Sequence, residues 1–397
     1  MKITETILHK AEQYRDYTAQ NLSQIIKIPS LSGEEEGVIA KLAQLLEDAN
    51  FDEVRTDRLG NLIGRIGSGS RKLAFDAHID TVDTGDLSQW EFDPFCGEIR
   101  DGKVLGRGTT DQKGGAASMI TAGRILKELG YDGKFTIYFT FTIMEEDCDG
   151  LCWDYLITEE KLVPDFAVLT EPTNLGVYRG HRGRMELDIY FKGLSCHASA
   201  PERGINAIYD ASRAALEIEK LDKKLASDEF LGKGTVAVTK IESESPSLCA
   251  VPDFCRIHLD RRLTWGETKD SAIAKIRKCL GKDAEVKVPS YSKSSYRGTV
   301  HPQELYFPTW KIPKSHPLVI AGIKSAQLAL NNEPVVDKWT FSTNGVALCG
   351  KHRIPCIGFG PGNEIQAHAP NETVPLEHLV KAADFYALLP YMLEKHN

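Results

Sequence analysis

The sequence predicts an α/β protein in which a domain with a mostly parallel central sheet is interrupted by an inserted ferredoxin-like α+β domain. Its 397 residues exceed the usual size of one domain. β-rich and helical segments alternate in the first and last parts of the chain, which predicts a sheet covered by helices. Between them the segment order is β-α-β-β-α-β, typical of ferredoxin-like units. We expect residues 1–178 and 295–397 to form the first domain and residues 179–294 the second.

The chain is expected to begin with two helices. Apolar residues recur at helical spacing over residues 2–27, and Pro29 ends that pattern. Ser32 and Glu35 then have the spacing of a capping box, in which a hydroxyl and a carboxylate bind free N–H groups at a helix start. The second helix should therefore follow Ser32.

The next segments are expected to build the main sheet. The apolar run Phe135–Met144 predicts a strand that is buried on both faces. The other predicted strands are Asn61–Ile66, Leu73–His78, Lys103–Leu105 and Phe166–Leu169, with helices near Gly115–Leu129 and 151–160.

The insert is predicted because the pattern of predicted strands and helices changes near Gly176–Gly183. Its expected strands are Met185–Phe191, Thr235–Ile241, Phe254–Leu259 and Ala284–Val288, and its helices are Ala207–Leu221 and Thr268–Leu280. The Ser-, Tyr- and Pro-rich segment Pro289–Pro317 predicts a return linker. A helix near 318–331, a strand at Ile354–Gly358 and a helix from about Leu376 should complete the main domain.

Composition excludes several classes of protein. Hydrophobic residues make up 42% of the chain and charged residues 26%, as in soluble globular proteins. The net charge of −8 disfavours nucleic acid or an anionic membrane as a partner. The chain has no apolar run of the roughly 18 residues needed for a membrane span, and its nine scattered cysteines are typical of a reducing compartment. We expect a cytoplasmic protein that acts on a small molecule.

Side chains that can bind metal follow the predicted strands. His78 and Asp80 lie two residues apart, so both point the same way and Asp80 can accept the second ring N–H of His78. Asp111 lies in a glycine-rich turn, which lacks the spacing of a phosphate-binding loop. The remaining candidates at strand ends are Glu145, Glu146, Glu171 and His368. Each motif alone has a plain explanation, such as a solvated loop, but α/β folds place ligands at these strand ends.

Taken together, the motifs resemble one known family. They are Ala77-His78-Ile-Asp80-Thr-Val, Gly106-Arg-Gly-Thr-Thr-Asp111-Gln-Lys-Gly-Gly, Glu145-Glu146, Thr170-Glu171-Pro-Thr, Cys196-His197-Ala-Ser-Ala-Pro, Val251-Pro-Asp, Asp260-Arg-Arg262 and Ala367-His368-Ala-Pro-Asn-Glu. Over nearly its whole length the chain resembles the dinuclear zinc amidohydrolases and peptidases that include aminoacylase, acetylornithine deacetylase, succinyl-diaminopimelate desuccinylase, carboxypeptidase G and peptidase T. The run Glu145–Trp153 most resembles a branch of selenium-metabolism-linked peptidases.

The resemblance implies two divalent metal ions, with zinc preferred and cobalt or manganese as alternatives. One ion would be held by His78, Asp111 and Glu171. The other would be held by Asp111, Glu146 and His368, with Asp111 bridging the two ions.

The resemblance also implies roles around the metals. Glu145 would be the general base, Asp80 would orient His78, and His197 on the insert would donate to the oxyanion, often across a dimer in this family. We therefore expect a homodimeric hydrolase. It would cleave a C–N amide bond of a small N-acyl amino acid, dipeptide or N-carbamoyl compound through a hydroxide shared by both ions.

Two further residues are expected to contact the substrate. Arg262 could bind a substrate carboxylate bidentately, although an ion pair with a neighbouring acid explains it equally well. Asn344 stands where the family often has Asp. Two alternatives stay open: a non-catalytic metal or small-molecule binding protein on the same scaffold, and a redox protein that uses Cys148 and Cys152.

Overall fold

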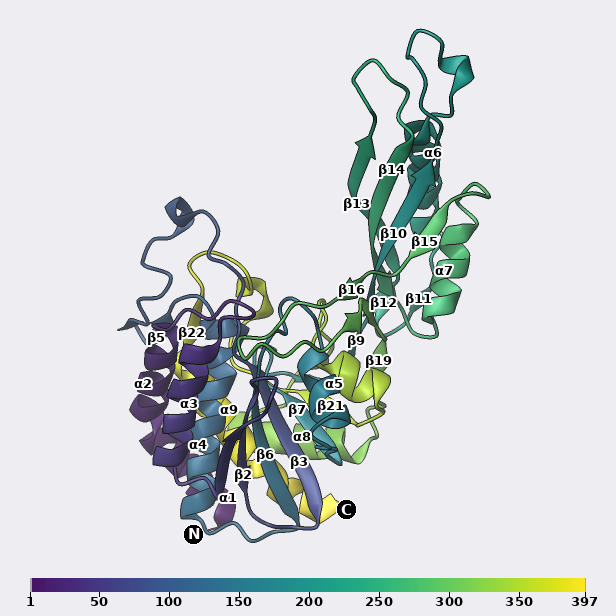
Figure 1. The fold of residues 1–397 in the computed structure, drawn as a ribbon. Coiled ribbons are helices and arrows are strands. Elements are labelled where there is room, and N and C mark those ends of the chain that lie inside the picture. Colours follow the sequence, from purple (N-terminus) through teal and green to yellow (C-terminus); the bar gives the residue numbers. More distant parts are fainter. Residues whose placement is uncertain (1, 397) are drawn as a thin grey trace.

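The computed structural model describes residues 2–396 and has two lobes (Figure 1). The larger lobe contains an eight-stranded sheet. Across the sheet the order is β1 (Glu53–Thr56), β2 (Leu62–Ile66), β6 (Phe135–Thr142), β3 (Arg71–His78), β7 (Phe166–Leu169), β21 (Cys356–Gly358), β8 (Val177–Tyr178) and β20 (Val336–Asp337). The central strands β6, β3, β7 and β21 run parallel. The mostly parallel α/β sheet predicted from the sequence is thus confirmed.

Helices cover both faces of this sheet because successive strand residues point to opposite sides. On β3, Leu73 and Phe75 face one hydrophobic core, while Ala74 faces the other. The first core is closed by α1 (Ile3–Gln13), α2 (Arg15–Ile26), α3 (Glu36–Asp48), α4 (Gly114–Glu128), α8 (Pro317–Leu330) and α9 (Leu376–His396). The second is closed by α5 (Leu151–Thr158) and the segment Val346–Lys351.

The start of the chain differs from the prediction in two ways. The single helix expected over residues 2–27 is broken at Tyr14, whose hydroxyl donates to the Glu128 carboxylate on α4. Ser32 does not cap a helix: its hydroxyl donates to Asp80 Oδ2 at 2.7 Å, and α3 starts only at Glu36. In both places a contact with a distant segment replaces the local pattern.

The smaller lobe is the insert, and it has its own hydrophobic core. Its antiparallel sheet has the order β13 (Thr235–Glu244), β14 (Phe254–Leu263), β10 (Gly183–Lys192) and β15 (Glu285–Lys287). The helices α6 (Ala207–Asp222) and α7 (Lys269–Arg277) pack on one face. This is the ferredoxin-like arrangement predicted from the sequence. The boundaries expected at residues 179 and 294 stay predictions.

The segment expected as a return linker contains short strands. They are β16 (Ser290–Tyr291), β17 (Gln303–Glu304), β18 (Tyr306–Phe307) and β19 (Trp310–Lys311), of which β18 pairs with β10 and β19 with β9 (Gly180–His181). Other short pairings join β4 (Ile99–Arg100), β5 (Lys103–Leu105) and β22 (Thr373–Pro375), and β11 (Ser227–Asp228) with β12 (Gly232–Lys233).

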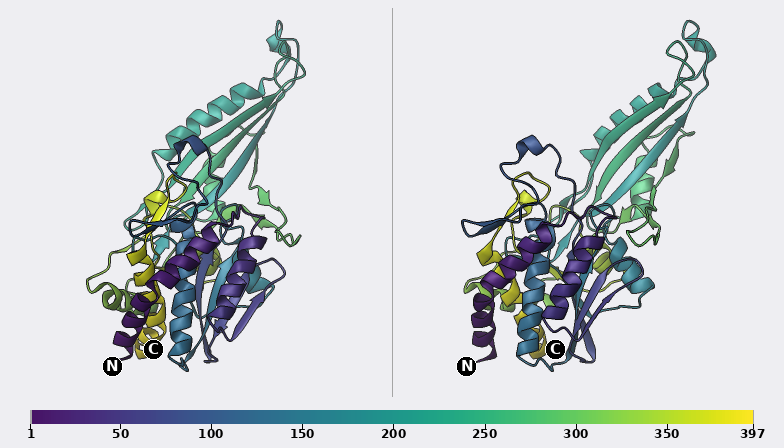
Figure 2. Two further views of the ribbon diagram at one scale, coloured as in Figure 1. Left: turned by 90° about the vertical axis from the view of Figure 1, so that its left-hand side faces the viewer. Right: turned by 60° about the vertical axis from the view of Figure 1, so that its left-hand side comes forward.

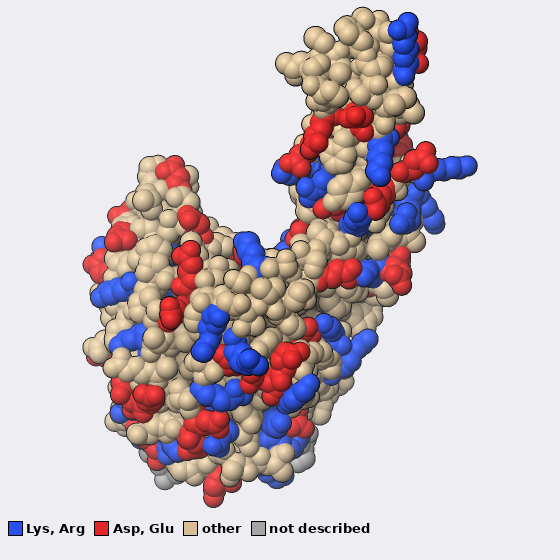
Figure 3. All heavy atoms as spheres, in the orientation of Figure 1, with Lys and Arg blue, Asp and Glu red and all other residues tan. Residues whose placement is uncertain are grey.

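The insert rises away from the edge of the main sheet at which β3, β6 and β7 end (Figures 1 and 2). In the space-filling view a wide hollow lies between the insert and the part of the main lobe that rises opposite it, and acidic and basic side chains are interspersed over this face (Figure 3). Both ends of the chain lie at the opposite side of the main lobe (Figure 1). None of the described helices is both long and apolar enough to cross a membrane.

Candidate metal centre

The ends of three neighbouring parallel strands bring four of the predicted residues together. His78 is the last residue of β3, Glu145 and Glu146 follow β6, and Glu171 follows β7. Because β6, β3 and β7 are adjacent and parallel, their carboxyl ends meet at one edge. Asp111 reaches the same edge from the turn before α4.

Asp111 lies between the two histidines. Its Oδ1 is 3.0 Å from His78 Nε2, and its Oδ2 is 3.4 Å from His368 Nε2. Next to His78, Glu171 Oε1 is 3.6 Å from the ring Nε2. Next to His368, Glu146 Oε2 is 2.9 Å from the ring Nε2. The structure therefore arranges two sets of three candidate ligands that share one carboxylate.

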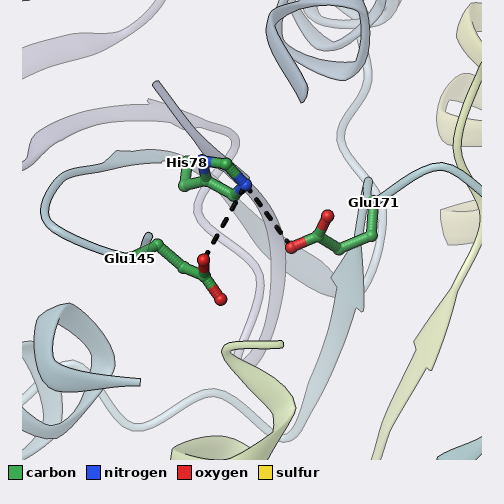
Figure 4. A group of neighbouring side chains, drawn as sticks. All are labelled: His78, Glu145 and Glu171. Carbon is green, nitrogen blue, oxygen red and sulfur yellow. Dashed lines mark ion pairs between the residues drawn. The ribbon is translucent and has the colours of Figure 1, made fainter. Parts of the chain in front are cut away.

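Glu145 lies beside these two sets. Its Oε2 is 4.0 Å from His78 Nε2, and Figure 4 shows the carboxylates of Glu145 and Glu171 approaching this nitrogen from different directions. His78, Glu145 and Glu171 form one group close enough to hold a cation, and His78, Asp111 and Glu146 form another.

Glycines and a buried acid place Asp111. Gly108 has a φ of 86°, and a Cβ there would lie 2.8 Å from Thr81 Cγ2, so only glycine fits this turn. The fully buried Glu372 accepts hydrogen bonds from the backbone N–H groups of Gly108, Thr110 and Asp111 at 2.7–3.0 Å. Sequence reasoning assigned Glu372 no role, although it ends the motif that contains His368.

Asp80 contacts His78 differently from the prediction. The closer contact to His78 Nδ1 comes from the backbone carbonyl of Asp80, at 3.0 Å, while Oδ1 is 3.6 Å away. The carboxylate instead accepts the backbone N–H groups of Glu145 and Glu146 at 3.2 and 3.0 Å. Buried Glu35 supports the same loop by accepting the Met144 N–H at 3.1 Å.

The charges of the site are unbalanced without cations. Burial raises the pKa of Glu145 and Glu171 well above its usual value, and burial together with repulsion from Asp111 raises that of Glu146 to about 7. Each of these three acids keeps one buried oxygen without a hydrogen-bond partner among residues 2–396. Hydrogen bonds to Asp111 and Glu146 raise the pKa of His368 to about 10. Imidazole and carboxylate donors with free oxygens fit divalent metal ions such as zinc.

The site opens into a cavity of about 350 Å³. It is lined by His78, Asp111, Glu145, Glu146, Asp149, Glu171, Arg184, Arg262, Phe341, Ser342, Glu364, Ala367 and His368. Arg262 lines this cavity, and its guanidinium pairs with Asp260 at 2.8 and 3.0 Å, so its contact with a substrate stays a prediction. Sequence reasoning missed Asp149, Arg184 and Glu364, because only the fold brings their side chains to this cavity.

The structure does not bring Asn344 to the substrate. Its side chain is buried, donates to Asp76 Oδ2 at 2.9 Å and accepts the Gly150 N–H at 2.9 Å. It is absent from the described residues that line the cavity. We therefore correct its expected role from substrate contact to support of the loop that follows β6.

His197 lies apart from the acids of its own chain. It is exposed, and its loop between β10 and α6 forms part of the tip of the insert, far from the main sheet (Figure 1). Its Nδ1 is 2.7 Å from the Ser199 hydroxyl. Cys148 and Cys152 are buried, and burial raises the pKa of both thiols. Thiolate formation is therefore disfavoured, which argues against the redox alternative.

Comparison with known proteins agrees with this geometry. Residues 74–391 match the model of peptidase family M20/M25/M40. The chain belongs to this family. As an M20 protein it is a hydrolase of the peptidase or deacylase type that acts on C–N bonds, and its donor set supports divalent metal ions.

Individual relatives cover most of the M20 chain. "Uncharacterized protein YgeY" of Escherichia coli K12 is 48% identical over 97% of this chain and 96% of its own. A succinyl-diaminopimelate desuccinylase of Cereibacter sphaeroides is 29% identical over 85% of this chain and 89% of its own. The YXEP protein of Bacillus subtilis, a dinuclear metal binding peptidase, matches with a TM-score of 0.72 at 16% sequence identity. The match covers 97% of this chain and 100% of that protein's chain, which shows the shared fold.

Proposed function

We propose that this M20 protein cleaves the C–N amide bond of a small N-acyl amino acid, dipeptide or N-carbamoyl compound. One observation carries the proposal: the two carboxylate oxygens of Asp111 face two different histidines. A carboxylate shared in this way is suited to hold two cations side by side. The cavity of about 350 Å³ above it suits a small substrate.

We infer that the ligand sets hold two divalent ions, with zinc preferred and cobalt or manganese as alternatives. His78, Asp111 and Glu171 would hold one ion, and Asp111, Glu146 and His368 the other. When bound, the ions supply Lewis acidity for attack of water on the amide carbonyl.

We assign the proton transfer to Glu145. Its side chain lines the cavity, and burial raises its pKa, so it takes up a proton more readily than an exposed Glu. Glu145 then accepts a proton from the attacking water and gives it to the leaving nitrogen. Asp80 holds the backbone of Glu145 in place and, through its carbonyl, orients His78.

The test uses zinc-loaded protein and the variant Glu145→Gln. Acetyl, succinyl, carbamoyl and aminoacyl amino acids are offered, and the released amino acid is measured. We expect turnover of at least one series and a fall of about 10²–10⁴-fold in kcat for the variant. The zinc content of the variant should be unchanged, which separates a lost base from a lost metal. Bound zinc without turnover of any amide would favour a non-catalytic binding protein.

We also propose a homodimer formed through the insert. Strand β13 lies at the edge of its sheet, and exposed apolar side chains lie on and beside it. These are Val238 and Ile241 on β13 and Tyr209 and Leu216 on α6. A second copy that pairs with this edge would cover them, and the His197 loop of one copy could then serve the site of the other. The expected cytoplasmic location stays a prediction.

Mixing two inactive variants tests the dimer and His197 together. His197→Ala and Glu145→Gln proteins are each expected to be nearly inactive. If His197 acts across the dimer, mixed dimers regain one working site, and activity returns to about one quarter of wild type. Analytical ultracentrifugation checks the oligomeric state. A monomer, or no recovery in confirmed mixed dimers, would contradict action across the interface.

A further inference from the structure

We propose that Asp149 binds an ammonium group of the substrate, so that the preferred compounds carry a positively charged amine as well as the bond to be cleaved. The inference rests on the proposed function, which makes the cavity the substrate site. It selects among the substrate classes that the proposed function leaves open, because simple N-acetyl and N-carbamoyl derivatives of neutral amino acids carry no such amine.

Asp149 has a carboxylate oxygen that is free to accept a hydrogen bond from a ligand. The residue is only 4% exposed and lines the cavity beside the metal ligands. Its Oδ1 lies 3.3 Å from Arg184 Nη1, whereas Oδ2 has no hydrogen-bond partner in the described part of the chain. A buried carboxylate oxygen without a partner is costly. A donor supplied by a ligand would remove that cost.

The two arginines that line the cavity near Asp149 have other acidic partners. Arg184 and Arg262 lie directly opposite one another on β10 and β14, and each has an acid on its own strand. Arg184 Nη2 is 2.8 Å from Glu186 Oε1, and Arg262 pairs with Asp260. Both guanidinium groups are therefore compensated without Asp149.

Metal ions do not compensate Asp149 either. Two divalent ions carry four positive charges, and the carboxylates set around them, with the histidines neutral, carry four negative ones. These carboxylates belong to Asp111, Glu145, Glu146 and Glu171. The negative charge of Asp149 is thus in excess in the loaded site. Glu364 adds a second negative charge. It also lines the cavity and has a buried oxygen without a hydrogen-bond partner within residues 2–396. A cationic ligand balances this excess.

Two kinds of amine meet this requirement. One is the free amino terminus of a dipeptide, and the other is the side-chain amine of an N-acylated diamino acid. Asp149 also borders a neighbouring cavity of about 250 Å³, which leaves space beside it for the rest of such a ligand. The shared chemistry is an ammonium group that donates to Oδ2.

Binding to the zinc-loaded Glu145→Gln variant tests the proposal without turnover. Calorimetry compares Nα-acetylornithine with N-acetylnorvaline, and Ala-Ala with N-propionylalanine, since the members of each pair differ in one amine. We expect about 10- to 100-fold tighter binding of the amine-bearing member in at least one pair, as for a hydrogen bond to a charged group. The pair that shows it identifies where the amine lies. Equal affinities within both pairs would overturn the inference.

Substitution assigns the preference to Asp149. Asp149→Asn, in the same Glu145→Gln background, should abolish the amine preference and leave binding of the two compounds without an amine nearly unchanged. Asp147→Asn is the matched control, because Asp147 lies in the same loop but pairs with Lys293 and Tyr291. A variant that weakens all four compounds equally would show that Asp149 only holds Arg184, and would refute the assignment.

The outcomes for the function and for the inference are separable. If the wild-type enzyme hydrolyses amides without an amine preference, the proposed function stands and the inference fails. If no amide is hydrolysed but the binding preference depends on Asp149, the inference stands and the hydrolase proposal fails.

Discussion

Glu372 holds the turn that carries Asp111, a candidate ligand of both metal ions. Its carboxylate accepts three backbone N–H groups around Asp111, and it also pairs with Arg107 Nη1 at 2.8 Å. The backbone of Asp111 is therefore held by a residue 261 positions away in the chain. Residues that form hydrogen bonds with a metal ligand fix the geometry of that ligand and change the metal affinity.

We expect Glu372→Gln to weaken metal binding. The amide group would set an N–H₂ donor against the backbone N–H donors and would leave Arg107 without its carboxylate. Zinc affinity should fall about 10- to 100-fold, as for other lost supports of metal ligands. Zinc titration with a competing chelator measures the change, and circular dichroism checks the fold. Unaltered affinity in a folded variant would show that the turn holds Asp111 by itself.

Helix α9 carries a buried acid that the metal site does not use. Asp384 is 1% exposed, and its Oδ2 is 3.7 Å from Lys381 Nζ. Burial raises its pKa to about 8, although Lys381 opposes the shift. The native state therefore holds a proton that the unfolded chain releases above about pH 4, so the native state loses stability as the pH rises from about 4 to about 8.

Asp384→Asn should remove this pH dependence. We expect the variant to be about as stable as wild type near about pH 5 and more stable by about 1–3 kcal/mol near about pH 9. The gain should level off only above about pH 9, where the Asp384 carboxyl of the wild-type protein is almost fully ionised. Urea unfolding at several pH values measures it. A stability difference that is the same at all pH values would contradict the raised pKa.

At the scale of the whole molecule, the proposed metal centre joins distant parts of the main lobe. Its candidate ligands end β3, follow β6 and β7, precede α4, or lie in the loop before β22. Without cations, the buried acids around Asp111 repel one another. Bound ions would thus hold several elements of the main lobe together.

Metal removal should lower the thermal stability of the protein. At a free zinc concentration of about 100 times Kd, binding to the native state adds about 2.7 kcal/mol. We expect chelation to lower Tm by several degrees and zinc to restore it. Asp111→Asn should lose this response, whereas Asp147→Asn should keep it. A Tm that is independent of metal in the wild-type protein would argue against ligand sets of this affinity.

The sequence alone determined the class of fold and the places where ligands could lie. Strand periodicity is local, so the apolar runs around residues 73–78 and 135–142 predicted buried parallel strands that the structure contains. Parallel neighbours end at one edge, so the polar residues after those strands were expected to meet. His78, Glu146 and Glu171 do lie there.

Only the tertiary structure decided the partners of these residues. The contact of Ser32 with Asp80, the bond of Asn344 to Asp76 and the approach of Asp149 to Arg184 each join residues at least 35 positions apart. Local spacing governs which face of a helix or strand a side chain occupies, but hydrogen-bond partners across the core are selected by packing. The capping box expected at Ser32 and the substrate contact expected at Asn344 are therefore replaced by hydrogen bonds to distant residues, Asp80 and Asp76.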